Sequence, residues 1–256
     1  GHLDVYGMWS ANLRDFDNDR ADADNYFTTQ RLCTYFEYIA NENLKAVFGL
    51  EIDNDWGSTD GTFARGAQWG SDAKGNIKVK HAYLDFTLPD TEINVKAGLQ
   101  YVALPSVFGH PVFEDDAAAL VVSAPINDMF GLALGYSRGY DVRRNPSAAQ
   151  GTRYSDNVDM GFLVAPVTLD GFSVAPYFAY ARVGEDADPT RGQVITSAPL
   201  ANNWGMVDDS IDIWALGAHA TLTMFDPLTF AADLIYGEGR TKLNDGVDRF
   251  SYKTQG

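Results

Sequence analysis

Several common stabilising features are scarce in this chain of 256 residues. It has a single cysteine, Cys33, so no disulfide framework can form within the chain. Its most apolar run, 117–126, has about ten residues, and a helix that crosses a bilayer needs about twice that number. No segment keeps apolar residues at the 3.6-residue spacing of an amphipathic helix. Disulfide scaffolds, transmembrane helices and helical bundles are therefore excluded.

Basic residues are also scarce, with 19 Lys and Arg against 35 Asp and Glu, which gives a net charge of −16. This balance argues against nucleic acid as a partner, because phosphate binding needs a basic face. It favours cations, divalent ions or simple solvation of the surface. The mean hydropathy of −0.21 resembles that of a soluble protein. A transmembrane barrel remains compatible with it, because barrel strands alternate and their loops are polar.

Motifs for catalysis are missing as well. The sequence contains no G-x-S-x-G element, and His219 has no serine at a matching position on a neighbouring strand. His2, His81, His110 and His219 lie too far apart to give the spacing of a metal site. We therefore predict that the protein is not an enzyme and needs no cofactor. Gly1 begins no signal peptide, as in a mature or trimmed chain.

Alternation of apolar and polar residues is the dominant pattern, and it is clearest between Thr28 and Trp56. Leu32 to Ala40 and Leu44 to Ile52 each place an apolar residue at every second position, with Thr34 as the one exception, around a turn at 41–43. Successive side chains of a strand point to opposite faces, so each strand has one apolar and one mostly polar face. This stretch is predicted to be a β-hairpin whose apolar face needs a cover.

The same pattern recurs along the chain and predicts about eleven strands and the start of a twelfth. Short and long connections alternate, so an up-and-down meander places all tight turns at one end and all long loops at the other. The predicted strands lie near 2–14, 28–40, 44–53, 82–88, 93–103, 118–124, 130–136, 158–164, 172–180, 214–222, 230–236 and from 250 onward.

Lipid is the favoured cover for the apolar faces. Tight turns at one end of the sheet and long loops at the other are typical of bacterial outer-membrane barrels. Phe and Tyr also recur near the strand ends, as they do in the aromatic girdles of such barrels. Charged residues on the opposite face suit a water-filled lumen and could not lie unpaired in a dry core. A soluble sandwich or binding module that turns these charges outward is the alternative. The predicted pore-lining residues are Arg14, Arg31, Cys33, Glu37, Lys45, Glu51, Asp53, His81, Asp85, Lys96 and Gln100.

Four strings together resemble one family: QRLCTYFEYIANENLKAVFGLEIDNDWG, VKHAYLDF, VKAGLQYVALPSVFGHPVFEDD and INDMFGL. They are similar to the homotrimeric outer-membrane porins of sulfate-reducing bacteria, from the first strand to about Tyr180. The resemblance implies an antiparallel sixteen-stranded barrel, a homotrimer and passive diffusion of small hydrophilic solutes. Family members are longer, so 1–256 is expected to be a single barrel domain that is incomplete at its C-terminus. The family pattern also leads us to expect arginine where Cys33 stands.

The resemblance also implies a site. In trimeric general porins the loop after the fifth strand enters the lumen, and here that loop is Pro105 to Asp116. Its residues Phe108, Pro111 and Phe113 are expected to pin it to the wall. The constriction residues are expected to be His110, Glu114, Asp115 and Asp116, facing basic residues at Arg14, Arg31, Lys45 and Lys96. The alternatives are a solvated turn at 114–116 and a plain cross-strand pair of Lys45 with Glu37.

Partners follow from the same expectations. The predicted surroundings are the bacterial outer membrane with its lipid and lipopolysaccharide, and the predicted trimer contact lies on the first strands. Carboxylates of the acidic loop at Asp15, Asp17 and Asp19 are weak candidates for a calcium ion. The acidic excess predicts a preference for cations, and a substrate-specific channel is the alternative to a general one.

Overall fold

The computed structural model describes residues 1–11, 24–58, 69, 77–107, 109–141, 157–184, 210–241 and 250–255. All regular structure within these ranges is β-strand, and none of it is a helix that could span a membrane. The strands are β1 (His2–Ala11), β2 (Asp24–Asn41), β3 (Leu44–Asp55), β4 (Ile77–Thr87), β5 (Asn94–Ala103), β6 (Glu114–Pro125), β7 (Gly131–Tyr140), β8 (Val158–Val164), β9 (Val167–Leu169), β10 (Phe172–Val183), β11 (Ile211–Phe225), β12 (Leu228–Thr241) and β13 (Phe250–Gln255).

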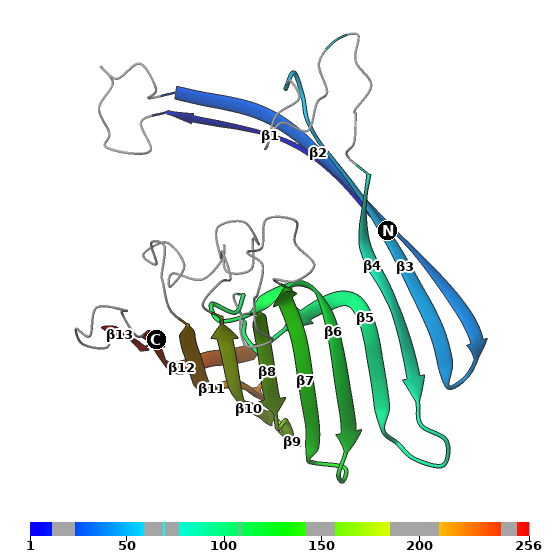
Figure 1. The fold of residues 1–256 in the computed structure, drawn as a ribbon, viewed down its shortest axis with the longest axis vertical. Coiled ribbons are helices and arrows are strands. Elements are labelled where there is room, and N and C mark those ends of the chain that lie inside the picture. The colour runs from blue at the N-terminus through cyan, green and yellow to red at the C-terminus, as the bar shows by residue number, and fades with distance from the viewer. Residues whose placement is uncertain are drawn as a thin grey trace, which may run out of the picture. The chain divides into compact units, whose positions relative to one another are not determined.

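Strands that follow one another in the sequence are neighbours in the sheet (Figure 1). The one addition to this order is the short strand β9, which pairs with β10 beside β8. Every strand pair with a recorded register is antiparallel, as tight hairpin connections require. The prediction of an all-β, antiparallel, up-and-down sheet is confirmed, including its short turns after β2, β4, β6 and β11.

Several strands begin earlier than predicted, and β4 and β6 show the physical reason most clearly. β4 begins at Ile77, directly after the predicted loop 57–76 and before the strand predicted near 82–88, because Ile77 and Val79 already alternate with Lys78 and Lys80. β6 begins at Glu114, inside the predicted constriction loop, because Glu114 to Asp116 pair with the end of β5. In both places charged residues continue a strand that had been assigned a start further along the chain.

The chain divides into two compact units. The first unit comprises Gly1–Ile39 and Ala46–Ala82, and the second comprises Ala40–Lys45 and Tyr83–Gly256. In the first unit, β1 and β2 pair from His2 opposite Cys33 to Ala11 opposite Asp24. The expectation that the whole chain is one barrel domain stays a prediction.

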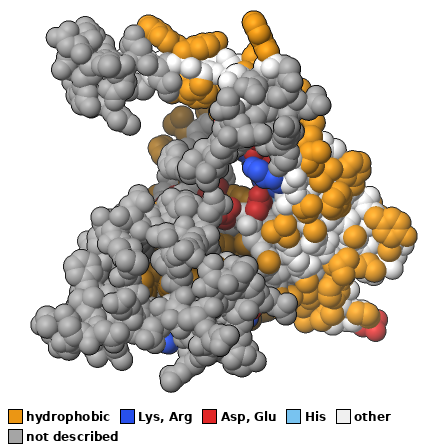
Figure 2. Space-filling view, turned by 45° about the horizontal axis from the view of Figure 1, so that its top comes forward, with side chains coloured by type: hydrophobic (Ala, Val, Ile, Leu, Met, Phe, Trp, Pro, Cys, Tyr) orange, Lys and Arg blue, Asp and Glu red, His pale blue; other side chains and the backbone are white. Residues whose placement is uncertain are grey.

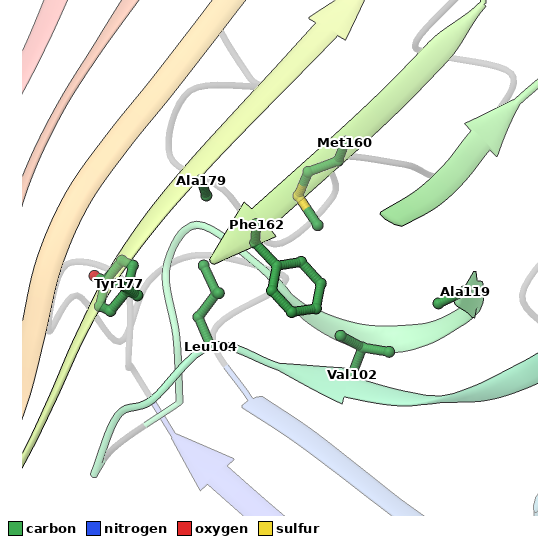
Figure 3. Close-up of a cluster of buried hydrophobic side chains, with 7 residues drawn as sticks. All are labelled: Val102, Leu104, Ala119, Met160, Phe162, Tyr177 and Ala179. Atoms are coloured by element: carbon green, nitrogen blue, oxygen red, sulfur yellow. The ribbon is translucent and has the colours of Figure 1, made fainter. Parts of the chain in front are cut away.

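In the second unit the registers give the sheet two distinct faces. Gly98, Ala119, Ser137 and Met160 are consecutive cross-strand partners from β5 to β8, so they share a face. Val102, Phe162 and Tyr177 belong to the same face, which we call the loop face; the opposite one is the outer face. A buried apolar cluster lies on the loop face (Figure 3): Val102, Leu104, Ala119, Met160, Phe162, Tyr177 and Ala179.

The outer face carries large apolar side chains that remain exposed. Leu134 is 53% exposed and Leu216 is 54% exposed, although both lie in the middle of their strands. Figure 2 shows hydrophobic side chains gathered over a broad part of the surface. Other exposed members of this face in the second unit are Tyr101, Leu120, Tyr136, Phe178, Tyr180, Phe230 and Leu234.

β8 departs from this arrangement. Val158, Met160 and Phe162 form the apolar side of the strand in the sequence, and the structure places them on the loop face. Met160 and Phe162 are buried there with Leu104, and Val112 and Phe113 of the same loop pack against this cluster. The apolar side of this one strand therefore faces a covering loop.

Candidate functional site

A loop that folds back over the loop face is the main structural feature of the candidate site. The loop spans Leu104 to Phe113, between β5 and β6, and Phe108 within it lies outside the described residues. A hydrogen bond from the Leu104 amide to the Phe113 carbonyl, 3.1 Å long, joins its two ends. Figure 3 shows Leu104 between Tyr177 of β10 and Phe162 of β8. The loop thus reaches strands that follow it by more than fifty residues.

The three acidic residues expected in this loop lie instead on β6. Ala103 pairs with Glu114, Val102 with Asp115 and Tyr101 with Asp116. Strand alternation therefore separates them, so that Asp115 shares the loop face with Val102 and the other two lie on the outer face. The expectation that all three form one group within the loop was wrong, because the backbone of these residues completes the β5–β6 ladder.

Glu114 nevertheless makes contact with the loop. One carboxylate oxygen, Oε2, accepts a hydrogen bond from the His110 amide at 2.6 Å. The other, Oε1, accepts one from the Tyr101 hydroxyl at 2.6 Å. Glu114 is therefore a local brace between the end of β5, the loop and the start of β6.

His110 is enclosed by the loop and by β10. It is 4% exposed, and its ring meets the Tyr177 ring edge-on with 4.8 Å between centroids. Its Nδ1 accepts hydrogen bonds from the amides of Val112 (3.1 Å) and Phe113 (3.3 Å), so in the neutral ring Nε2 carries the hydrogen. Burial lowers the pKa of His110 to about 4, and the ring is therefore neutral at pH 7.

A second carboxylate ties the loop to a distant strand. Asp233 Oδ2, on β12, accepts hydrogen bonds from the Ser106 hydroxyl (2.9 Å) and from the Val107 amide (3.1 Å). Asp233 Oδ1 lies 2.7 Å from His219 Nδ1, and His219 Nε2 lies 3.0 Å from the Thr221 hydroxyl. Neither Asp233 nor Thr221 was singled out from the sequence, because only the fold brings β11, β12 and the loop together.

In the second unit, two predicted pore-lining residues, Lys45 and Lys96, lie near the carboxylate of a third, Asp85. Asp85 Oδ2 lies 3.7 Å from Lys45 Nζ and 3.9 Å from Lys96 Nζ, and Asp85 Oδ1 accepts a hydrogen bond from Asn94 at 2.7 Å. Lys45 therefore pairs with Asp85, not with the Glu37 of the alternative reading. Gln100, also predicted, is buried and donates to the carbonyls of Lys96 and Ala119.

In the first unit a cluster of charges surrounds two buried carboxylates of β3. Glu51 and Asp53 are 7% and 3% exposed. The Arg31 guanidinium contacts Glu51 and lies 3.6 Å from Asp53 Oδ1. Lys78 Nζ lies 2.8 Å from Asp53 Oδ2, and Lys80 Nζ lies 3.0 Å from Glu51 Oε2. Burying two carboxylates requires such partners.

This cluster joins three predicted residues to two that the sequence reading missed, Lys78 and Lys80. Alternation of lysine with Ile77 and Val79 was the signal that could have found them. A cavity of about 610 Å³ lies beside the cluster and is lined by Arg31, Lys78 and Asp4 among others. The cavity is therefore bordered by charges of both signs.

Other predicted residues of the first unit lie near this cluster or elsewhere on the strands. Cys33 is fully buried, with Sγ 3.7 Å from Glu51 Oε2. His81 packs against Tyr35 at 5.3 Å between ring centroids, and Glu37 is exposed. Arg14 and the candidate calcium ligands Asp15, Asp17 and Asp19 lie outside the described residues. Within the described ranges no three His, Cys, Asp or Glu side chains come close enough to hold a metal ion.

A row of alternating charges crosses five strands on the outer face of the second unit, towards the long loops. Tyr136 and Tyr180, two residues before the arginines of β7 and β10, donate hydroxyl hydrogen bonds of 2.7 Å and 2.6 Å to aspartates of the row. The charged row therefore lies next to a layer of tyrosines on the same face. Its members are successive cross-strand partners: Arg138, Asp159, Arg182, Asp212 and Arg240.

No protein-family model and no curated protein matches the sequence. Solved structures do match in shape. OprB from Pseudomonas putida gives a TM-score of 0.50 at 12% identity, over 96% of this chain and 75% of that one. OmpF from Salmonella typhi, in complex with daunomycin, gives 0.47 at 14% identity, over 94% and 66%. A triple mutant of the Rhodopseudomonas blastica porin gives 0.40 at 12% identity, over 99% and 93%. The likeness to OprB shows a shared fold.

Proposed function

We propose that this chain forms a porin channel of the bacterial outer membrane, through which small hydrophilic solutes and ions diffuse passively. One observation carries the proposal: the two faces of the same sheet suit two different surroundings. The outer face exposes rows of Leu, Phe and Tyr, whereas the first unit and the loop face carry charged and polar groups that need water or partners.

The length of the apolar rows supports a lipid surrounding. On β10 the outer face runs from Phe172 through Phe178 and Tyr180 to Arg182. These ten steps correspond to roughly 33 Å of strand, or about 25 Å of depth at the usual barrel tilt. An outer-membrane barrel presents an apolar band of this height, bounded by aromatic residues. A soluble sandwich would cover this band with a second sheet, whereas all described strands belong to one sheet and leave the band exposed, which disfavours a soluble binding module.

The row of alternating charges supports the proposal that the apolar band of the outer face ends near the long loops. Arg138 and Asp159 pair at 2.8 Å, and each arginine of the row is matched by a neighbouring carboxylate. Matched charges above a level of tyrosines suit the headgroup layer of a membrane. Lipopolysaccharide, held through divalent cations such as calcium, is the lipid partner proposed for this level. No enzymatic role and no other cofactor is proposed.

The position of the loop Leu104–Phe113 supports the proposal that it narrows the channel. Ser106 and Val107 attach it to β12, which places the loop over the face that carries Asp115 and Gln100. We propose that solutes pass this loop, and that the acidic residues give the channel a preference for cations. A homotrimer related to the porins of sulfate-reducing bacteria is part of the same proposal. A substrate-specific channel is the second candidate, favoured by the 610 Å³ cavity beside Arg31.

Planar-bilayer recording under a salt gradient tests the channel and its selectivity. The reversal potential is expected to show cation preference, and Asp115→Asn, which neutralises the one carboxylate of 114–116 on the loop face, should reduce it. Asp128→Asn, in the exposed turn between β6 and β7, is the matched control. Anion preference in the unaltered protein would contradict the selectivity. A stable monomer in water without detergent would contradict the membrane location.

A further inference from the structure

We propose that Asp233 is the positioning residue of the channel: its carboxylate fixes the loop Leu104–Phe113 against the loop face. The consequence for permeation rests on the proposed function, whereas the structural role does not. A loop that narrows a channel must stay in place, because movement of a few ångströms alters the opening. The question is therefore which groups hold the loop to the sheet.

Among the described residues, two carboxylates outside the loop accept hydrogen bonds from it, and they differ in reach. Glu114 accepts from the His110 amide only four residues away, so this bond shapes the loop but connects it only to its own end. Asp233 accepts from Ser106 and Val107, which precede it by 127 and 126 residues. It is the attachment that ties the first half of the loop to β12. Two donors on one carboxylate oxygen form a stronger link than a neutral pair would.

The carboxylate is itself held in place from the sheet. His219 lies directly opposite Asp233 in the β11–β12 ladder, and its Nδ1 is 2.7 Å from Asp233 Oδ1. The Thr221 hydroxyl, 3.0 Å from His219 Nε2, completes the chain of contacts on the same face. Both oxygens of Asp233 are therefore occupied, one by the sheet and one by the loop. The Asp233 side chain therefore connects the sheet to the loop through its two carboxylate oxygens.

Apolar packing alone would leave the loop free to slide. Leu104 and His110 pack against Phe162 and Tyr177, but contacts of this kind tolerate shifts along the strands. Hydrogen bonds to Asp233 require distances near 3 Å and fix one register. The removal of the carboxylate should therefore loosen residues 106 and 107 while the apolar cluster keeps the loop near the sheet.

Hydrogen exchange of the Val107 amide tests this role without any channel measurement. In detergent-solubilised protein, Asp233→Ala should raise the exchange rate of this amide on the order of tenfold or more, since its acceptor is lost. Asp233→Asn keeps an oxygen acceptor and should retain most of the protection. Asp128→Ala, an exposed carboxylate in a turn far from β12 in the sequence, should leave the rate unchanged.

Single-channel recording of the same variants tests the consequence. Asp233→Ala should raise the frequency of current interruptions severalfold, whereas Asp233→Asn and Asp128→Ala should resemble the parent. Ser106→Ala, which removes one donor and leaves the carboxylate, should give an intermediate frequency. If Asp233→Ala does not fold, Asp233→Ser, whose shorter side chain cannot reach both the loop and His219, takes its place, and unchanged Val107 exchange in that variant would then overturn the proposal.

The two measurements separate the possible failures. Unchanged Val107 exchange in folded Asp233→Ala would overturn the positioning role whatever the recordings show. Increased exchange with unchanged channel noise would overturn the link to permeation. If the unaltered protein forms no channel but Val107 exchange responds as expected, the proposed function fails and the positioning of the loop by Asp233 stands.

Discussion

The two faces of the second unit's sheet carry apolar residues for opposite reasons. On the loop face, small residues lie beneath large ones: the Phe162 ring lies over Gly135, and the Tyr177 hydroxyl lies over Gly217. On the outer face, Leu134, Leu216 and their neighbours are more than two-fifths exposed, and no described part of the chain covers them. Apolar character alone therefore does not tell a packed face from an exposed one. On the loop face, Gly135 and Gly217 leave space for the Phe162 and Tyr177 side chains of neighbouring strands, which pack in one cluster with Leu104 of the loop.

The largest loss of stability is expected when a charged residue is introduced on the outer face. Leu216→Arg is expected to destabilise the protein in phospholipid vesicles by about 2–4 kcal/mol, the cost of an arginine near the middle of a bilayer. Reversible unfolding from vesicles by denaturant measures the change in the free energy of unfolding. Leu216→Phe, which keeps the position apolar, is the control and should change it by less than about 1 kcal/mol. Equal stability of both variants would show that this face does not contact lipid.

A smaller effect is expected from filling a recess on the loop face. Gly217→Ala places a Cβ against the Tyr177 hydroxyl and 2.5 Å from the Leu234 carbonyl oxygen. Overpacking of this kind destabilises by about 1–3 kcal/mol. Gly161→Ala is the matched control, since its Cβ would lie 3.8 Å from the nearest oxygen. The same unfolding experiment compares the two, and an equal change for both would contradict close packing at Gly217.

The smallest change in stability near neutral pH is expected for the docking of the loop Leu104–Phe113 onto the sheet. Burial lowers the pKa of His110 to about 4, from 6.5 in an exposed ring, so the released loop binds the proton more readily than the docked one. Docking is therefore fully stable above pH 6.5 and weakens as the pH falls towards 4. The expected loss is about 2 kcal/mol at pH 5, from 1.36 kcal/mol per pH unit.

Hydrogen exchange of the Val112 amide between pH 7 and pH 5, corrected for the intrinsic pH dependence of exchange, measures this weakening. Val112 donates to His110 Nδ1, the atom that protonation removes as an acceptor. His110→Gln keeps an acceptor without a proton to gain in this range, and its protection should be independent of pH. Protection of the unaltered loop that stays constant down to pH 5 would contradict a buried neutral His110.

Most of the strand order could be predicted because alternation is a local signal. Every predicted strand is present, and the short turns after β2, β4, β6 and β11 fall where they were expected. Errors arose at strand starts that carry charged residues: Lys78 and Lys80 in β4, which were left unassigned, and Glu114 in β6, which was assigned to a loop. A strand at the rim of the sheet can carry charged residues because its polar side chains meet water or one another.

The candidate site was predictable only in part. Arg31, Glu51 and Asp53 were assigned to one polar face by alternation, and the structure brings them together. Lys45 and Lys96 were assigned to the same face, but their common partner Asp85 depends on how β4 and β5 lie beside each other. His219 gave no signal as a supporting residue, because its role depends on Asp233 and on a loop more than one hundred residues earlier.

By itself, the sequence determined the class of the fold, the direction of each strand and the apolar character of one face, since these follow from contacts between near neighbours in the chain. Only the tertiary structure decided which apolar face is covered by protein, which carboxylate holds the loop and where the acidic residues of 114–116 point. These depend on register and on contacts across many strands. A hydrogen bond between residues 106 and 233 exists only after the strands between them have been placed.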